Sequence, residues 1–575
     1  MNQNLTFTKQ PIINLAAICA QKGVRHFIIS PGSRSAPLTM ALAGQAGLEC
    51  RVVMDERAAA FIALGLAQQT RAPVGLVCTS GTAGLNYAPA VAEAFYQQIP
   101  LLIFTADRPP EWIDQQDGQT IRQTNLYGAH IRASFQLPVD YTHPDAQWHL
   151  ERVISEAINA ACWPVPGPVQ VNVPLREPLY PPPGAVVQPQ PGRKLIQMQP
   201  AQAALSEPVW VELLARWEQA EKKLIVAGLH PYHPRLTAAL ATLQQHPAVA
   251  LIGDLTANIH QAGARLHLWD MALGTKSDET LAALAPDLLI TFGGPVVSKY
   301  LKLFLRKHKP REHWHIDPAG QTIDTFQSLT QVIPTTAGYF FETLSRQTQA
   351  PAISATAETY FTLWQQQEIK AQKTLAAFLA EVPFGEFQAV YQVMQALPEP
   401  GRLQLGNSMP VRYANFIGLP GRDIQVNANR GTSGIDGAVS TTVGAAMAAR
   451  QITTLITGDL AFFYDRNALW HNHRPENLRL VILNNHGGGI FKLIDGPGNL
   501  PEAELTTYFE TPHDLTAKNT AADYHCAYLY CHNAADLQGL LPTFFSPSCG
   551  TAILEIETDS TINAAVFQKF KAMLA

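Results

Sequence analysis

Residues 456–460 read Ile-Thr-Gly-Asp-Leu, and residues 480–491 read Leu-Val-Ile-Leu-Asn-Asn-His-Gly-Gly-Gly-Ile-Phe. Each stretch begins as a short apolar run, typical of a buried strand in a parallel sheet, and then changes abruptly to polar residues and glycine. The first run ends at Asp459 and the second at Asn485. Because parallel strands end at one sheet edge, where open α/β sheets bind ligands, we expect these two side chains to converge.

The residue types at this expected edge suit a cation and a phosphorylated ligand. Carboxylate and amide oxygens are hard ligands for a divalent ion such as Mg²⁺. The glycines after Asn485 allow close backbone approach, and a helix expected over residues 461–471 would offer free N–H groups to an anion. Taken separately, Asp459 also suits a helix cap and residues 484–487 suit a turn, and both alternatives stay open.

The composition restricts the class of protein. The 575 residues are 47% hydrophobic and 15% charged, which predicts a globular protein of about three or four domains. The net charge of −5 gives no electrostatic argument for a nucleic-acid partner. The seven cysteines are scattered without CxxC spacing, which indicates reduced thiols and a cytoplasmic location. Neither a signal peptide nor a membrane span is predicted, because the chain lacks the apolar segments that both require.

Strand-like apolar runs alternate with helical patterns over most of the chain. This alternation predicts an α/β protein, with three doubly wound parallel-sheet domains. The expected order is an α/β domain over 1–180, a Pro-rich linker over 181–208, a central α/β domain over 209–345, a helical connector over 346–382 and a third α/β domain over 383–575. The glycine turn at 292–295 has no GxGxxG or GxxxxGKS/T pattern, so no nucleotide or FAD site is predicted there.

The pairing of Gly-Asp after one strand with Asn-Asn after another resembles the fingerprint of thiamine-diphosphate-dependent enzymes. The resemblance implies that Asp459, Asn485 and the Gly487 carbonyl coordinate a Mg²⁺ or Mn²⁺ ion that bridges the diphosphate of the cofactor, thiamine diphosphate. The third residue of the fingerprint is usually Gly, whereas this chain has Leu460. Cofactor contacts are further implied at Gly458, Leu460, Ile490 and Phe491.

Glu56 follows a predicted strand and begins an apolar helix. A glutamate there favours the helix dipole without any catalytic role, and that explanation stays open. In thiamine-diphosphate enzymes, however, the glutamate at the equivalent position hydrogen-bonds N1′ of the aminopyrimidine. The resemblance implies that Glu56, with a pKa raised by an apolar pocket, shares a proton with that ring, and that a cofactor carbon attacks the substrate.

Longer runs of sequence resemble one particular family within this superfamily. This chain is similar to the menaquinone-pathway synthases of the superfamily, the 2-succinyl-5-enolpyruvyl-6-hydroxy-3-cyclohexene-1-carboxylate synthases, at residues 30–35 (Ser-Pro-Gly-Ser-Arg-Ser), 79–83 (Thr-Ser-Gly-Thr-Ala), 105–111 (Thr-Ala-Asp-Arg-Pro-Pro-Glu) and 429–437 (Asn-Arg-Gly-Thr-Ser-Gly-Ile-Asp-Gly). The similarity implies decarboxylation of 2-oxoglutarate and 1,4-addition of the succinyl unit to isochorismate. It also implies a homodimer or a dimer of dimers, with the cofactor lying between two chains.

Both implied substrates are polyanions, so the site should be rich in arginine, which pairs bidentately with carboxylates. Four arginines at predicted strand ends or polar turns match arginines of the family: Arg34, Arg108, Arg412 and Arg430. Their alternative role is surface solubility. The resemblance also implies cofactor contacts at Ser33, Gly81 and Ile435, a catalytic position near the reacting centre at Gln119, and substrate contacts at Ser408 and Lys299. Ordinary core packing for Ile435 and a solvated surface position for Lys299 stay open. Gly118 and Tyr300 depart from the family, which has Asn and Arg there.

Two other functions stay open on the sequence alone. One is another thiamine-diphosphate enzyme, a 2-ketoacid decarboxylase or an acetolactate-synthase-like enzyme, against which the four arginines argue. The other is a non-catalytic, cofactor-binding subunit, against which the intact Glu56, Asp459 and Asn485 argue. An assay with 2-oxoglutarate and isochorismate would distinguish the three.

Overall fold

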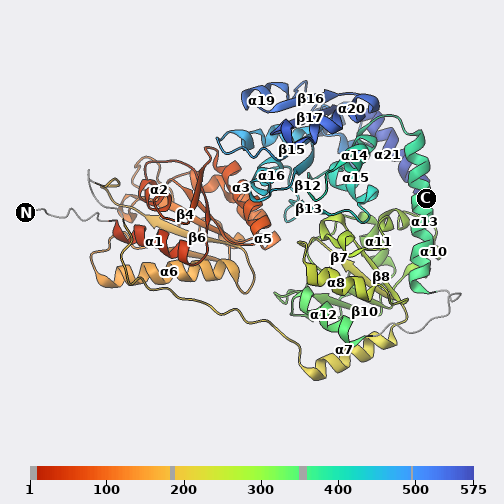
Figure 1. The fold of residues 1–575 in the computed structure, drawn as a ribbon, viewed down its shortest axis with the longest axis horizontal. Coiled ribbons are helices and arrows are strands. Elements are labelled where there is room, and N and C mark those ends of the chain that lie inside the picture. Colours follow the sequence, from red (N-terminus) through yellow and green to blue (C-terminus); the bar gives the residue numbers. More distant parts are fainter. Residues whose placement is uncertain (1–8, 182–187, 349–358, 494–495, 575) are drawn as a thin grey trace, which may run out of the picture. The chain divides into compact units, whose positions relative to one another are not determined.

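The structure is a computed structural model that describes residues 9–181, 188–348, 359–493 and 496–574. Within these ranges the chain forms three sheets, of six, five and six strands (Figure 1). Neighbouring strands run parallel, and many neighbours are not consecutive in sequence, so crossover connections build each sheet. The predicted α/β class with three doubly wound parallel sheets is confirmed.

The first sheet has the strand order β2-β1-β3-β4-β6-β5. Its strands are β1 (His26–Ile29), β2 (Glu49–Val52), β3 (Val74–Cys78), β4 (Leu101–Asp107), β5 (Ala133–Gln136) and β6 (Pro168–Pro174). The helices between them are α1 (Gln10–Gln21), α2 (Ala36–Ala43), α3 (Glu56–Thr70), α4 (Ala83–Asn86), α5 (Ala88–Gln97) and α6 (Pro144–Cys162). The apolar side chains of α1 and α6 pack with those of the sheet in one buried core.

Helices α3 and α16 (Ala438–Ala448) pack against each other through two glycines. A Cβ added to Gly65 of α3 would lie 2.0 Å from the Thr441 carbonyl oxygen, and one added to Gly444 of α16 would lie 2.0 Å from the Ile62 carbonyl oxygen. Both distances are well inside van der Waals contact, so the two backbones touch directly. This contact fixes α3, which begins at Glu56, against α16.

Gly444→Ala is therefore expected to destabilise the fold, because the methyl group would force the two helices apart. Overpacking of this kind lowers the free energy of unfolding by about 1–3 kcal/mol. Gly539→Ala is the matched control, since Gly539 lies in α20 (Ala534–Phe544) with no atom close to an added Cβ, and alanine favours a helix interior. Thermal unfolding should give a lower midpoint for the first variant only; equal midpoints would contradict the direct backbone contact.

The second sheet has the strand order β11-β10-β9-β7-β8. Its strands are β7 (Lys223–Ala227), β8 (Val249–Gly253), β9 (Leu288–Phe292), β10 (Glu312–Ile316) and β11 (Gln331–Ile333). The helices around it are α7 (Glu207–Gln219), α8 (Pro234–Leu243), α9 (Trp269–Ala272), α10 (Asp278–Leu284), α11 (Lys299–Lys307) and α12 (Ala337–Gln347). Two buried clusters, one on each face, show that helices cover both sides.

The longest described helix, α13 (Tyr360–Glu381), follows the second sheet. Glutamine, lysine and glutamate occur along its length, so its composition is not that of a membrane-spanning helix. None of the helices in the described ranges combines the length and the apolar character needed to cross a bilayer.

The third sheet has the strand order β13-β12-β14-β15-β17-β16. Its strands are β12 (Gly401–Leu405), β13 (Ile424–Ala428), β14 (Thr453–Gly458), β15 (Leu478–Asn484), β16 (Ala527–Cys531) and β17 (Ala552–Glu557). Its further helices are α14 (Glu386–Ala396), α15 (Met409–Ile417), α17 (Asp459–Tyr464), α18 (Glu502–Leu505), α19 (Lys518–Asp523) and α21 (Ser560–Leu574). Helices α14, α15 and α21 share one apolar core with this sheet.

By compactness the chain divides into two units. The first is Met1–Pro200 with Asn429–Arg450 and Tyr464–Leu478, and the second is Ala201–Ala428 with Gln451–Phe463 and Arg479–Ala575. The first sheet belongs to the first unit, and the other two sheets belong to the second. The domain and linker boundaries expected from the sequence stay a prediction.

One helix prediction is wrong. The helix expected over 461–471 is instead α17, which ends at Tyr464, followed by a short 3₁₀ helix, η5 (Arg466–Leu469). Between them Asp465 is fully buried, and its carboxylate accepts hydrogen bonds from the Ser440 N–H and hydroxyl, each at 2.7 Å. This anchoring ends the helix earlier than the apolar spacing indicated.

Candidate functional site

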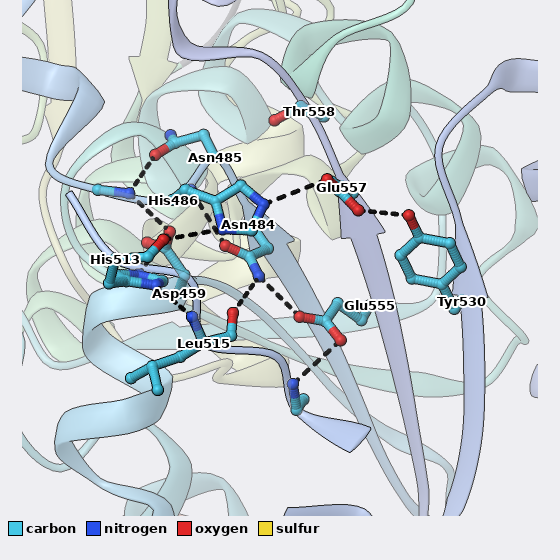
Figure 2. Close-up of polar contacts among 12 residues, drawn as sticks. Asp459, Asn484, Asn485, His486, His513, Leu515, Tyr530, Glu555, Glu557 and Thr558 are labelled. Atoms are coloured by element: carbon cyan, nitrogen blue, oxygen red, sulfur yellow. Dashed lines mark hydrogen bonds and ion pairs between the residues drawn. The ribbon is translucent and has the colours of Figure 1, made fainter. Parts of the chain in front are cut away.

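The ends of β14 and β15 place the two predicted cation ligands around one backbone N–H group. Asp459 directly follows β14 and is 2% exposed. Its Oδ2 accepts a hydrogen bond from the Gly487 N–H at 3.0 Å, and Oδ1 of Asn485 accepts from the same N–H at 3.2 Å (Figure 2). The structure therefore brings together the side chains that the sequence predicted to converge.

The donor set of this group suits a hard divalent cation. Burial raises the pKa of the Asp459 carboxyl, while the N–H groups of Leu460 and Gly487 and the ring of His513 oppose that effect. A cation beside Asp459 would supply the opposite charge that a buried carboxylate needs. The Asn485 amide oxygen and the Gly487 carbonyl are oxygen ligands of the same hard type. Gly487 also has no room for a side chain, because a Cβ there would lie 2.8 Å from a backbone oxygen.

His513 is a neighbour of Asp459 that the sequence did not indicate. Its Nε2 lies 3.3 Å from Asp459 Oδ2, without hydrogen-bond alignment to any residue that the structure describes. Its Nδ1 accepts a hydrogen bond from the Leu515 N–H at 3.1 Å, so Nε2 is the ring nitrogen on the side of the Asp459 carboxylate. No spacing pattern links residues 459 and 513, and only the fold brings them together.

Asn484, the first residue of the Asn-Asn pair, hydrogen-bonds to Leu515 and Glu555 rather than toward Asp459 (Figure 2). Its Nδ2 donates to Glu555 Oε1 at 2.7 Å and to the Leu515 carbonyl at 3.0 Å. The second oxygen of Glu555 accepts from the Tyr528 hydroxyl at 2.6 Å and from the Ala517 N–H at 3.0 Å. Asn484 is thus a structural residue, and its partners fix the start of the loop that carries Asn485.

Glu56 is the first residue of α3, after β2 at the edge of the first sheet, and it is half-buried. Burial is the largest cause of its raised pKa, and the charge of Asp55 raises it further. Asp55 caps the helix, because its Oδ1 accepts from the Ala58 N–H at 3.1 Å. The Glu56 side chain is therefore not needed as a cap, and a carboxyl with a raised pKa at a sheet edge suits proton sharing with a ligand.

The turn after β3 lies against the segment that carries Gln119. Gly81 has φ +86°, and a Cβ there would lie 3.4 Å from Gln119 Cα. The Gly81 N–H donates to Gln123 Oε1 at 2.8 Å, which holds the turn in place. The hydroxyl of Ser80 is buried and has no hydrogen-bond partner within the described residues. An unsatisfied buried hydroxyl at a sheet edge fits a site that receives a polar ligand group.

Arg34 and Arg108 are electrostatic neighbours in the first unit. Arg34 is 6% exposed, and its Nη1 donates to the Leu175 carbonyl at 2.9 Å. Burial lowers the pKa of Arg34 most, and the charge of Arg108 lowers it further. Arg108 lies 3.4 Å from Asp117 and donates to the Gly118 carbonyl at 3.1 Å. The two arginines are therefore close enough for the charge of one to affect the other, and each also lies near a carboxylate, Glu177 for Arg34 and Asp117 for Arg108.

The segment 429–437 is fixed by Glu93 of α5, which the sequence did not indicate. Glu93 is 1% exposed, and its carboxylate accepts from the Gly431 N–H at 2.7 Å and from the Thr432 N–H and hydroxyl, both at 2.6 Å. Arg430 immediately precedes these bonds, and Ile435 follows them with 43% of its surface exposed. An exposed isoleucine on a fixed segment is suited to packing against a bound molecule.

Ser408 has a strained backbone, with φ +73° between β12 and α15. Non-glycine residues rarely adopt such angles, and they cluster at functional sites. The Arg412 guanidinium, one helical turn later, donates through Nη1 to the Ser408 carbonyl. The structure therefore brings together these two predicted substrate contacts.

Lys299 is exposed as the first residue of α11, after β9. The Ser298 hydroxyl caps this helix by accepting from the Leu301 N–H at 3.0 Å. Tyr300 is half-buried and packs against two apolar clusters. Residue 300 is thus a packing residue in this chain, beside an exposed Lys299.

The remaining predicted positions are Gly458, Ile490 and Phe491 in the second unit and Ser33 in the first. Gly458 has no atom within 4 Å of an added Cβ, so its surroundings are open. Ile490 is half-buried against the core, and the ring of Phe491 lies 5.6 Å from that of Phe509. In the first unit, Ser33 Oγ lies 3.3 Å from the Tyr180 hydroxyl.

The predicted site residues therefore form two groups, one in each unit. The group of the first unit is Ser33, Arg34, Glu56, Gly81, Arg108, Gln119, Arg430 and Ile435. The group of the second unit is Lys299, Ser408, Arg412, Gly458, Asp459, Leu460, Asn485, Gly487, Ile490 and Phe491.

Two parts of the chain match known protein families. Residues 14–126 match a family described as the N-terminal TPP-binding domain of thiamine pyrophosphate enzymes, and residues 192–405 match one described as the middle domain of thiamine pyrophosphate. Thiamine pyrophosphate is thiamine diphosphate. A 2-succinyl-5-enolpyruvyl-6-hydroxy-3-cyclohexene-1-carboxylate synthase from Cytophaga hutchinsonii is 44% identical over 563 residues, which cover 98% of each chain. The chain belongs to this synthase family.

Other members of the synthase family match over a similar length. The synthase of Flavobacterium psychrophilum is 39% identical, covering 98% of this chain and 99% of its own. That of Desulfotalea psychrophila is also 39% identical, covering 96% of this chain and 99% of its own. The resemblance seen in the sequence is confirmed, and because the matches are nearly end to end, they include both groups of site residues.

Proposed function

We propose that this member of the synthase family joins 2-oxoglutarate to isochorismate with loss of CO₂, giving 2-succinyl-5-enolpyruvyl-6-hydroxy-3-cyclohexene-1-carboxylate for menaquinone biosynthesis. Bound thiamine diphosphate would supply the carbon nucleophile for decarboxylation and for the 1,4-addition. The observation that carries the proposal is the convergence of Asp459, Asn485 and Gly487 at one sheet edge, in a chain of this family.

The second unit would hold the cofactor diphosphate and its cation. Asp459, the Asn485 amide oxygen and the Gly487 carbonyl supply hard oxygen ligands for Mg²⁺ or Mn²⁺. Gly458 and Leu460 border the first ligand, and Ile490 and Phe491 would form an apolar wall. In the first unit, Ser33, Gly81 and Ile435 would contact the cofactor, and Glu56 would hold a proton at N1′ of its aminopyrimidine ring.

The arginines would select the substrates by charge. Arg34 and Arg108 present two neighbouring cations, and each guanidinium can bind a carboxylate through two parallel hydrogen bonds. Arg412 and Arg430 would add further cations, with Ser408, Gln119 and Lys299 as polar contacts. A polyanionic acceptor would gain binding free energy from these charges and a neutral acceptor would not, which favours isochorismate over the acceptors used by acetolactate-synthase-like enzymes.

The assembly and location are part of the same proposal. We expect a homodimer, or a dimer of dimers, in the cytoplasm. In such an assembly the first-unit group of one chain, which includes Glu56, would form one site with the second-unit group of its partner, which includes Asp459. Sedimentation of the active protein measures this, and a fully active monomer would contradict it.

The function is tested by assaying the purified protein with thiamine diphosphate, Mg²⁺, 2-oxoglutarate and isochorismate. We expect the succinylated product and one CO₂ per turnover, and a large loss of product when either substrate is omitted. Pyruvate in place of 2-oxoglutarate should be a poor donor, because it lacks the distal carboxylate. Efficient turnover of pyruvate alone would favour a decarboxylase, and cofactor binding without turnover of any of these compounds would favour a non-catalytic subunit.

A further inference from the structure

A buried glutamate in the second unit contacts the side chain of Asn485. Glu386 is the first residue of α14 and is 4% exposed. The Asn485 side chain donates through Nδ2 to Glu386 Oε1 at 2.5 Å. A glutamate at a helix N-terminus is commonly explained by the helix dipole, but such residues are normally exposed. Glu386 instead directs its carboxylate into the protein, at a proposed cation ligand.

The position of Glu386 is fixed independently of Asn485. Its N–H donates to Asn563 Oδ1 at 2.9 Å, and a Cβ on the preceding Gly385 would lie 2.7 Å from that same oxygen. The side chain of Tyr413, which is 1% exposed, lies close to the Glu386 carboxylate. With its backbone held and its carboxylate enclosed, Glu386 forms an acceptor facing Asn485.

An acceptor at this place determines how the Asn485 amide is oriented. An amide has one oxygen and one NH₂ group, and the Asn485 NH₂ group donates to Glu386 Oε1 at 2.5 Å. This contact leaves Oδ1 on the side of Asp459 and the Gly487 N–H, 3.2 Å from that N–H. A flipped amide would present NH₂ to the cation and could not coordinate it.

We infer that Glu386 is a positioning residue for the cation site, which holds the Asn485 amide with its oxygen toward the bound ion. The inference rests on the proposed cation role of Asp459 and Asn485. Outer partners that orient metal ligands are commonly worth about 10–100-fold in metal affinity. We expect Glu386 to contribute to metal affinity by a similar factor, although it would touch neither the ion nor the cofactor.

The test measures Mn²⁺ binding by electron paramagnetic resonance on the full-length protein with thiamine diphosphate and no substrate. Glu386→Leu should weaken Mn²⁺ binding about 10–100-fold, because it leaves the amide free to flip. Glu386→Gln should stay within about threefold of wild type, since its Oε1 can still accept from Asn485. Glu368→Gln is the matched control: Glu368 is also buried in this unit, but its carboxylate accepts from the His267 and Leu268 N–H groups and from the Gln372 side chain, so its substitution should leave Mn²⁺ binding unchanged.

The glutamine and leucine variants together separate orientation from a general structural role, because glutamine keeps an acceptor for Asn485 and leucine does not. If the leucine variant does not fold, Glu386→Met gives the same comparison. The inference is overturned if the folded apolar variant binds Mn²⁺ like wild type, or if glutamine is as harmful as leucine. If Asp459→Asn also binds Mn²⁺ normally, the proposed cation site itself is wrong, which is a distinct failure.

Discussion

Glu56→Gln is expected to remove nearly all enzyme-promoted exchange of the thiamine diphosphate C2 proton while leaving the protein folded. Glutamine has the shape of glutamate but cannot share a proton with N1′ of the aminopyrimidine. In this protein, burial raises the pKa of Glu56, so its carboxyl keeps a proton to a higher pH than an exposed glutamate does. A positioned acid or base contributes about 10²–10⁴-fold to rate, and we expect a loss of that size.

The exchange is measured by acid quench and proton NMR after transfer of the holoenzyme into deuterated water. The helix should survive the substitution, because its cap is Asp55, whose Oδ1 accepts from the Ala58 N–H at 3.1 Å. Glu49→Gln is a suitable control, since Glu49 is an exposed carboxylate on the preceding strand, β2. Exchange at the wild-type rate in Glu56→Gln would remove this carboxyl from the proposed mechanism.

The strand ends were predictable because a local pattern defines them. The apolar run before Gly458 and the run before Asn484 are observed as β14 and β15, each buried along nearly its whole length. Once the strands are parallel, Asp459 and Asn485 must lie at one edge, so the geometry of this part of the site followed from the sequence. The close approach of Gly65 and Gly444 did not follow, because a helical glycine has no sequence signal for the backbone that it will touch.

The supporting residues were not predictable, because their roles depend on contacts between distant segments. Glu93 lies in a helix of the first sheet, yet it accepts three hydrogen bonds from residues 431 and 432. Glu386 has the sequence context of an ordinary helix start, and His513 that of a loop histidine. The residues expected to touch ligands could thus be found through motifs, whereas those that hold them in position required the fold.

Asp459→Asn is expected to abolish tight binding of Mn²⁺, and with it Mn²⁺-dependent binding of thiamine diphosphate. Asparagine can still accept the Leu460 N–H, which lies 2.7 Å from Oδ1. It loses the bond from the Gly487 N–H to Oδ2, but that N–H keeps a second acceptor, Asn485 Oδ1 at 3.2 Å, so the loop should keep its shape. Asparagine lacks the negative charge that a hard cation requires, and the loss should exceed the about 10–100-fold typical of changes to outer partners. This loss of affinity is measured by calorimetric titration of the protein with thiamine diphosphate, in the presence and in the absence of Mn²⁺.

The same substitution should have the opposite effect on the protein without ligands. Burial raises the pKa of Asp459, so ionisation is unfavourable in the folded state, and the neutral amide removes that cost. The ligand-free variant should therefore unfold at the wild-type temperature or above it, while losing the increase that Mn²⁺ and cofactor give to wild type. Asp465→Asn is the control, because burial likewise raises the pKa of Asp465, to about 7, but its carboxylate binds Ser440 rather than the proposed ion. It should keep the ligand-induced increase. If Asp459→Asn also kept it, the proposed ligand role of Asp459 would be wrong.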